Sequence, residues 1–168
     1  MKNKYCPNCG NKLKDKFVQD EGLIPYCDKC DKLYFEIYSV AVSMIIIAKN
    51  TKRVLLVKQY NKEFYRFVAG YINKGEGAED AIYREMNEEI SKKPIFIKPL
   101  KTGFFEPSET LMLNYLAIIE DEDIKPNYEI DTYDFFEIDE ALTKLKSTSL
   151  AKIFYEYFLE NCGDEIDV

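Results

Sequence analysis

Gly70-Tyr-Ile-Asn-Lys-Gly-Glu-Gly-Ala-Glu-Asp-Ala-Ile-Tyr-Arg-Glu-Met-Asn-Glu-Glu89 is the stretch of sequence that decides the fold. It reads as a glycine-bounded loop that leads into a helix over residues 78–91. Glu85 and Glu89 stand one turn apart on this helix, and Glu88 adjoins both. Glu89 also falls inside the apolar stripe that should face the core. Clustered carboxylates repel each other and resist burial, so the pattern favours a site for a divalent cation, magnesium or manganese.

The alternative is an ordinary solvated helix with charge pairs, such as Arg84 with Glu88 at i,i+4. The spacing argues against this alternative. It consists of a glycine, five residues, a glutamate, seven residues, Arg-Glu, two residues and Glu-Glu. Chance agreement with such a pattern is on the order of 10⁻⁷ per window. The fixed positions are Gly70, Glu76, Arg84, Glu85, Glu88 and Glu89.

This pattern resembles the sequence box of the Nudix hydrolases. The resemblance implies an α/β/α sandwich with a mixed sheet. It also implies hydrolysis of a diphosphate that joins a nucleoside to another group, by a metal-activated water. The implied roles are Mg²⁺ or Mn²⁺ binding by Glu85, Glu88 and Glu89, orientation of these ligands by Arg84 and Glu76, and close backbone approach at Gly70.

The end of the box departs from the family pattern. The family has a glycine two residues beyond the last glutamate, where this chain has Ser91. Glycine suits a left-handed helix cap better than serine does. We therefore expect a changed helix exit and intact chemistry.

Two Cys-x-x-Cys pairs precede the box, Cys6 with Cys9 and Cys27 with Cys30, with seventeen residues between the pairs. This spacing predicts a closed four-cysteine site for structural zinc, which would supply the folding free energy of so short a segment. A disulfide pair and redox-active cysteines are the alternatives, but neither explains two matched pairs. We expect a small zinc ribbon over residues 1–37 and a Nudix hydrolase domain over residues 38–168.

Apolar runs and turns predict the remaining elements. Val40–Ala48 is an almost unbroken apolar run, typical of a strand buried on both faces. Strands and helices interleave without a strict βαβ rhythm, which favours a mixed sheet between helices. Further strands are expected over residues 53–58, 64–69, 95–105, 110–119 and 133–138, and one or two closing helices over residues 140–161.

The residues around the box narrow the resemblance. Val68-Ala69-Gly70-Tyr71 stands where most Nudix chains carry Pro-Gly-Gly, and with the four cysteines it is similar to the NADH pyrophosphatases. This similarity implies that NAD(H) or a related dinucleotide is split into AMP and a mononucleotide. It also implies that Tyr71 stacks on a substrate ring and that the protein forms a homodimer. For Tyr71, packing beneath the loop is the alternative.

Residues 102–108 depart from that subfamily, which carries Ser-Gln-Pro-Trp-Pro-Phe-Pro there. Phe104 and Phe105 are candidates for a base-stacking wall, with strand-end packing as the alternative. The subfamily also has a metal-binding glutamate where this chain has Thr132, and Asp131 is a candidate replacement. The reaction class is therefore better supported than the substrate. The alternatives are hydrolysis of ADP-ribose, a nucleotide sugar or a nucleoside triphosphate, and a non-catalytic nucleotide-sensing regulator.

Composition limits the other function classes. The net charge of −7 argues against electrostatic binding to nucleic acid or anionic membranes, so NAD-capped RNA has no support from charge. Residues 1–37 carry seven lysines against six acids, which gives no basic patch for a nucleic-acid reader. The sequence has no membrane-spanning run and its start lacks a secretory signal, so a cytoplasmic protein is expected. The absence of histidine excludes histidine base catalysis and histidine metal ligands.

Overall fold

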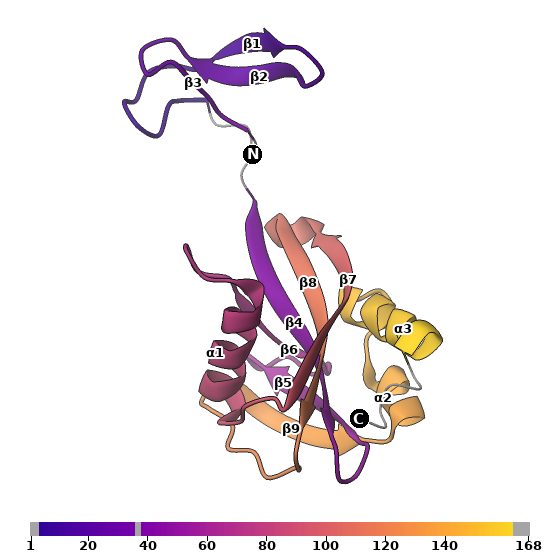
Figure 1. Ribbon diagram of the computed structural model, residues 1–168. Coiled ribbons are helices and arrows are strands. Elements are labelled where there is room, and N and C mark those ends of the chain that lie inside the picture. Colours follow the sequence, from indigo (N-terminus) through magenta and orange to yellow (C-terminus); the bar gives the residue numbers. More distant parts are fainter. Residues whose placement is uncertain (1–3, 36–37, 163–168) are drawn as a thin grey trace. The chain divides into compact units, whose positions relative to one another are not determined.

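The computed structural model describes residues 4–35 and 38–162, in two compact units, Met1–Tyr38 and Ser39–Val168. The first unit holds a small antiparallel sheet of β1 (Lys14–Val18), β2 (Gly22–Cys27) and β3 (Lys32–Leu33) (Figure 1). Residues 14–18 and 22–27 pair across a tight turn, and Cys27 is the last residue of β2. The small sheet thus fixes where the second cysteine pair begins.

The second unit is built on a mixed sheet with strand order β7-β8-β4-β5-β9, and β6 pairs with β4. Strands β4 and β8 run parallel at the centre over ten residue pairs, and the other pairings are antiparallel. The mixed sheet that the sequence predicted is therefore confirmed. The strand bounds are β4 Ser39–Ala48, β5 Val54–Gln59, β6 Val68–Tyr71, β7 Phe96–Phe105, β8 Thr110–Ile119 and β9 Ile130–Phe136.

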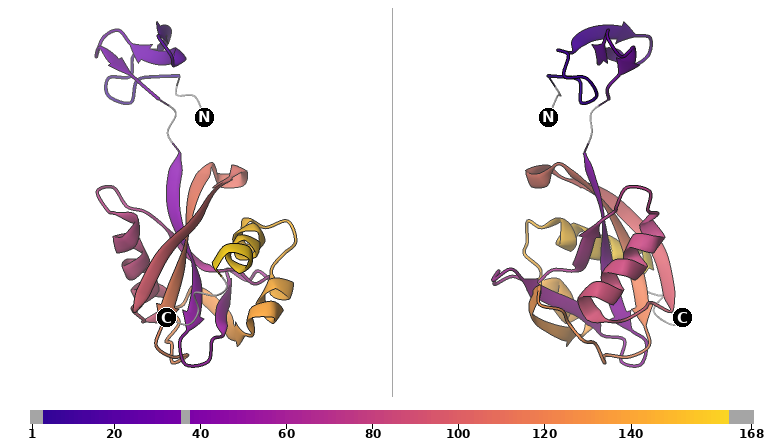
Figure 2. Two further views of the ribbon diagram at one scale, coloured as in Figure 1. Left: turned by 45° about the vertical axis from the view of Figure 1, so that its right-hand side comes forward. Right: turned by 90° about the vertical axis from the view of Figure 1, so that its left-hand side faces the viewer.

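Helices cover both faces of this sheet, as Figures 1 and 2 show. Helix α1 (Ala78–Ile90) covers one face, and α2 (Ile138–Lys144) and α3 (Leu150–Cys162) cover the other. Alternate residues of β4 enter the two cores, Met44 facing α1 and Ile45 facing α3, which is why the whole strand reads as apolar. The predicted α/β/α sandwich is confirmed. Within the described residues, none of the helices has the length and apolar character needed to cross a membrane.

The exit of α1 differs from the sequence expectation. Ser91 adopts the left-handed conformation, with φ 55° and ψ 34°, so the expected change of helix exit is wrong. Its N–H donates to the carbonyl of Asn87 at 3.2 Å, and the N–H of Lys92 donates to the carbonyl of Met86 at 3.3 Å. The Ser91 hydroxyl also donates to the carbonyl of Lys125 at 3.2 Å, a tertiary hydrogen bond that glycine could not make. The serine therefore closes the helix as a glycine would.

Two strands have bounds that differ from those predicted. Strand β6 begins at residue 68, not 64, because Tyr65 and Arg66 form only isolated bridges to Leu145 and Val57. Strand β9 begins at residue 130, not 133. A short 3₁₀ helix, Glu106–Ser108, connects β7 to β8. These differences all fall around the carboxylate cluster. The earlier start of β9 bears on whether Glu129 or Asp131 reaches this cluster.

Candidate functional site

Arg84 binds three of the glutamates in the box. Its Nε and Nη2 donate to the two oxygens of Glu76 at 2.7 and 2.9 Å, a bidentate pair. Its Nη1 donates to Glu85 at 2.5 Å and to Glu88 at 3.3 Å, and Nη2 also reaches the carbonyl of Tyr71 at 2.8 Å. Hydrogen bonds from Arg84 and from a loop N–H lower the pKa of Glu76 to about 2. Arg84 thus ties the loop before α1 to Glu85 and Glu88 of the helix.

Glu89 is buried, with 4% of its surface exposed, in agreement with its place in the apolar stripe. Its Oε2 accepts a 2.6 Å hydrogen bond from Nε2 of Gln59, at the end of β5. Burial, followed by the negative charges of Glu85 and Glu129, raises the pKa of Glu89 to about 8. In the absence of a cation this carboxyl group holds a proton at neutral pH.

Glu129 is an acid of the site that the sequence did not single out. It lines the same cavity as Glu89, and it accepts a 2.5 Å hydrogen bond from the hydroxyl of Tyr60. The N–H of Asn127 donates to the carbonyl of Glu89 at 2.8 Å, which ties this loop to the end of α1. Asp131, the predicted replacement, instead accepts a 2.6 Å hydrogen bond from an exposed backbone N–H and does not line the cavity.

The signal that could have found Glu129 is weak. The sequence offers Glu129 and Asp131 within three residues, and only the start of β9 decides between them. Because β9 begins at residue 130, Glu129 is the last residue of the loop that packs on α1. A strand beginning at residue 133 would have left both acids in the loop.

Gly70 lies on β6 opposite Val42 of β4, directly beneath the helix. A Cβ atom added there would lie 1.9 Å from Cδ of Glu85. Such a contact is impossible without displacing the carboxylate. The glycine that opens the box thus leaves the space in which the carboxylate of Glu85 lies against the sheet.

These residues surround a cavity of about 510 Å³. We call this the main cavity, and we call its lining carboxylates, Glu85, Glu88, Glu89 and Glu129, the acid wall. Tyr71 and Phe105 also line it, and these residues are 56% and 42% exposed. Phe104 does not line it, because successive residues of β7 face opposite sides of the sheet.

A second cavity of about 260 Å³ lies next to the main cavity. It shares Arg66, Phe67, Ala69, Phe105 and Met112 with the main cavity and continues to the start of α3. Because its remaining lining is mostly aliphatic and aromatic, we call it the apolar cavity. Together the two cavities offer a charged region and an adjoining apolar region, within the size range of small-molecule sites.

The carboxylates and the cysteines differ in how far they are pre-assembled. Within the described residues, the only group of three or more acid or thiol side chains with all ligand atoms within 4.8 Å of one another is Cys6, Cys9, Cys27 and Cys30. The glutamates instead bind separate partners, Arg84, Gln59 and Tyr60. Carboxylate oxygens suit Mg²⁺ and Mn²⁺, and the glutamates must exchange partners to hold such an ion.

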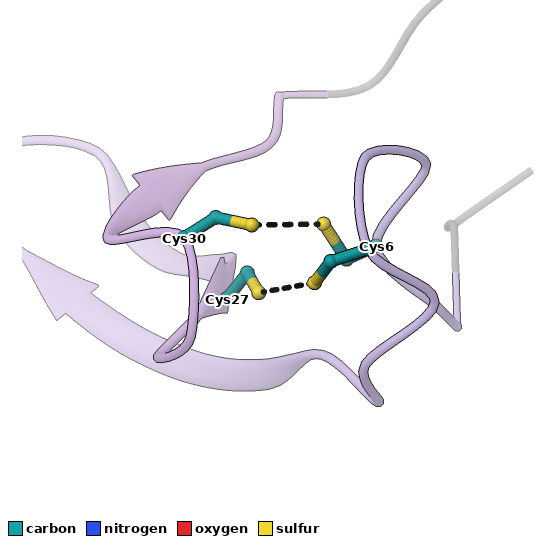
Figure 3. Close-up of side chains that lie close together, drawn as sticks. Cys6, Cys27 and Cys30 are labelled. Atoms are coloured by element: carbon teal, nitrogen blue, oxygen red, sulfur yellow. Dashed lines mark hydrogen bonds between the residues drawn. The ribbon is translucent and has the colours of Figure 1, made fainter.

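The four cysteine sulfurs fit a zinc ion. Figure 3 shows the sulfurs of Cys6, Cys27 and Cys30 turned toward a common centre. The Sγ atoms of Cys6 and Cys30 are 3.9 Å apart, and those of Cys9 and Cys27 are 3.6 Å apart. These distances are too long for a disulfide, whereas tetrahedral Zn–S bonds of about 2.3 Å require sulfur separations of about 3.8 Å.

Tyr34, the residue after β3, supports this cluster. Its hydroxyl lies 3.1 Å from Sγ of Cys6, where it can donate a hydrogen bond to a thiolate. Burial opposes ionisation of Cys6, but hydrogen bonds from Tyr34 and from backbone N–H groups outweigh it and lower the thiol pKa to about 6. Cys6 is therefore prepared to bind a cation as a thiolate.

Comparisons with known proteins agree with this geometry. The family model described as NUDIX domain matches residues 37–158. A relative from Chromobacterium violaceum, named NAD-capped RNA hydrolase NudC, is 27% identical over 143 residues, covering 82% of this chain and 51% of that protein. One of the same name from Haemophilus influenzae (strain PittEE) is 29% identical over 174 residues, covering 97% of this chain and 62% of that protein. This chain thus spans about half the length of the curated relatives it matches.

A solved structure of a NUDIX hydrolase from Nitrosomonas europaea matches with a TM-score of 0.68 at 18% identity, covering 96% of this chain and 93% of that chain. A likeness at this identity establishes the fold alone. The family model covers the sheet, the box helix and most of α3. On these matches, the chain belongs to the Nudix hydrolase family.

Proposed function

We propose that this chain is a divalent-metal-dependent hydrolase that splits NAD(H) or a related dinucleotide into AMP and a mononucleotide. The observation that carries the proposal is the main cavity, which is lined by four carboxylates and by two exposed aromatic residues. A cavity of about 510 Å³ with charged and aromatic lining suits a diphosphate flanked by rings.

The acid wall has the donor chemistry for Mg²⁺ or Mn²⁺, with Glu85, Glu88 and Glu89 as the ligands and Glu129 beside them. A cation bound there would supply the positive charge that lets water attack a doubly anionic diphosphate. Glu76 holds Arg84 through two hydrogen bonds, so the guanidinium keeps its place when the other glutamates change partners. Gly70 leaves the space that Glu85 occupies.

The substrate half of the proposal rests on the rings and on the names of relatives. Tyr71 and Phe105 are exposed at the main cavity, where a substrate ring could stack on them. Phe104 does not line this cavity, so the proposal assigns it no contact with substrate. The curated relatives are named for hydrolysis of NAD-capped RNA. The net charge of −7 gives no electrostatic support for RNA, so free NAD(H) is the first substrate to test.

We further propose that residues 1–37 form a zinc ribbon with a structural role and that residues 38–168 form the hydrolase domain. The sulfur separations of 3.6 and 3.9 Å support the zinc assignment. The homodimer and the cytoplasmic location stay predictions. Zinc content by mass spectrometry of the native protein tests the first assignment, and a ratio of one zinc per chain is expected.

The test of function is product identification by mass after incubation with Mg²⁺ or Mn²⁺. The panel contains NADH, NAD-capped RNA, ADP-ribose, a nucleotide sugar and a nucleoside triphosphate. NADH should give AMP and the reduced mononucleotide, and Glu89→Gln should lower turnover at least about 10²-fold while the protein stays folded. Faster cleavage of another conjugate would replace the substrate. Binding of ADP-ribose without any product would favour a nucleotide-sensing regulator.

A further inference from the structure

Two arginines line the main cavity, and they differ in their partners. Arg84 donates to three carboxylates and one carbonyl. For Arg66, by contrast, no carboxylate in residues 4–35 and 38–162 lies within ion-pair distance, and its Nε is buried without a hydrogen-bond partner. A buried donor left unpaired is costly. A guanidinium in this state beside a cavity indicates a place for an anionic ligand.

The position of Arg66 is fixed by its backbone and its ring contact. The N–H and carbonyl of Arg66 each make a 2.9 Å hydrogen bond to Val57 of β5. Its guanidinium carbon lies 4.8 Å from the ring centroid of Phe64, and Nζ of Lys146 lies 5.7 Å from the same centroid. Two positive groups therefore meet at one aromatic ring, and Phe64 and Arg66 both line the apolar cavity.

Arg66 also borders the acid wall without being neutralised by it. The hydrogen bond to Glu129 and burial raise the pKa of Tyr60 to about 12, and the positive charge of Arg66 opposes part of that rise. Arg66, Tyr60 and Glu129 all line the main cavity. A diphosphate carries several charged oxygens, and cations on the acid wall bind those that face the glutamates. A guanidinium elsewhere in the lining can bind an oxygen that these cations leave free.

We propose that Arg66 binds the substrate phosphate that faces away from the acid wall and so directs the half of the substrate attached to it toward the apolar cavity. The ligand class is a nucleoside monophosphate or the corresponding half of a dinucleotide. This inference rests on the proposed function only for the identity of the complete substrate. Arg66 is a binding residue, so its loss weakens affinity and leaves the chemical step intact.

The first test uses AMP and adenosine, which differ by one phosphate and contain no diphosphate. Calorimetric titrations are made in buffer without magnesium or manganese, with the full chain and its zinc retained, so that the acid wall attracts no phosphate. The wild-type chain should bind AMP more tightly than adenosine, and Arg66→Gln should reduce that preference about 10- to 100-fold. Arg66→Lys should restore part of it, because lysine keeps the charge and loses the fork.

Lys58→Gln is the matched control. Nζ of Lys58 lies 4.8 Å from the ring centroid of Tyr65, the same separation as Arg66 from Phe64, but Lys58 lines neither cavity. This variant should keep the preference for AMP, and thermal melting checks that both variants are folded. An equal preference in Arg66→Gln and wild type, or no saturable AMP binding by the wild type, overturns the assignment.

The kinetic test separates this inference from the proposed function. With the substrate that the panel identifies, Arg66→Gln should raise KM about 10- to 100-fold and change kcat less than about threefold. If the wild type hydrolyses NADH and this variant has an unchanged KM, the anion site fails alone. If the wild type hydrolyses no compound of the panel and yet binds AMP through Arg66, the proposed function fails and the anion site stands.

Discussion

Replacement of Glu89 by glutamine should stabilise the chain in buffer without magnesium or manganese. Glu89 is 4% exposed, and its pKa rises from 4.5 to about 8 on folding. A raised carboxyl pKa means that the folded state holds a proton that the unfolded state has already lost. Stability from this group is therefore fully present below pH 4.5 and falls as the pH rises toward 8. A glutamine has no proton to lose, and it can still accept the hydrogen bond from Gln59.

The magnitude follows from the two pKa values. One pKa unit corresponds to about 1.4 kcal/mol, so the variant should exceed wild type by less than about 1 kcal/mol at pH 5. At pH 7 the folded group is still mostly protonated and the unfolded group is ionised. The advantage of the variant should then reach about 2–4 kcal/mol. The growth of this difference with pH is the diagnostic quantity.

The assay is urea unfolding of both proteins from pH 5 to pH 8, with zinc retained in the cysteine cluster. Glu88→Gln is the comparison variant. It keeps the carboxyl group of Glu89 and removes an exposed charge that contributes to its raised pKa, so its stability should still fall as the pH rises, as in wild type. Added Mg²⁺ should stabilise wild type, by about 2.7 kcal/mol at a hundredfold excess over the dissociation constant, and should stabilise Glu89→Gln less. A difference between Glu89→Gln and wild type that stays constant from pH 5 to 8 would refute the protonated state of Glu89.

Three further variants test other parts of the site. Gly70→Ala should reduce kcat with Mg²⁺ at least about 10²-fold, because the new Cβ would overlap the carboxylate of Glu85. Unchanged activity would show that this carboxylate is free to move. Glu129→Gln should lower kcat/KM at least about tenfold, whereas Asp131→Asn should change it less than about threefold. The reverse order would return the metal-binding role to Asp131. Tyr34→Phe should weaken zinc retention about tenfold in competition with a chelator, because it removes the hydroxyl beside Sγ of Cys6. Equal zinc retention by the variant and wild type would show that the hydroxyl does not support the metal.

The sequence predicts the architecture well wherever periodicity is strong. Strand β4 and helix α1 were both expected within one residue of their observed ends, because one is apolar throughout and the other follows a 3.6-residue period. Ser91 shows where such reasoning stops. Its left-handed conformation is supported by a hydrogen bond to the carbonyl of Lys125, and a contact between residues 34 positions apart leaves no local signal.

The residues of the candidate site also differ in how well the sequence predicts them, according to whether they are close together in the chain. The box places Arg84 and its three glutamates correctly because all of them lie on one loop and one helix. Glu129 reaches the same cavity from the loop before β9, and Gln59 reaches it from the end of β5. The sequence could not place the ends of these two strands to the nearest residue. Strand β5 has a register shift between Lys58 and Gln59, and such irregularities decide which side chain faces the acid wall.

The acid wall itself needs a different explanation from the one that the sequence suggested. Crowded carboxylates seemed to require a bound cation, yet the chain neutralises them with its own groups. Arg84 binds Glu76, Glu85 and Glu88, and Glu89 takes a proton because burial and its neighbours raise its pKa to about 8. The i,i+4 pair that the solvated-helix alternative predicted is therefore present, between Arg84 and Glu88 at 3.3 Å. It does not argue against a metal site, because an arginine and a proton are both replaceable. A divalent cation must replace the proton on Glu89 and the contacts of Arg84 to Glu85 and Glu88, so its affinity should rise with pH until Glu89 is ionised.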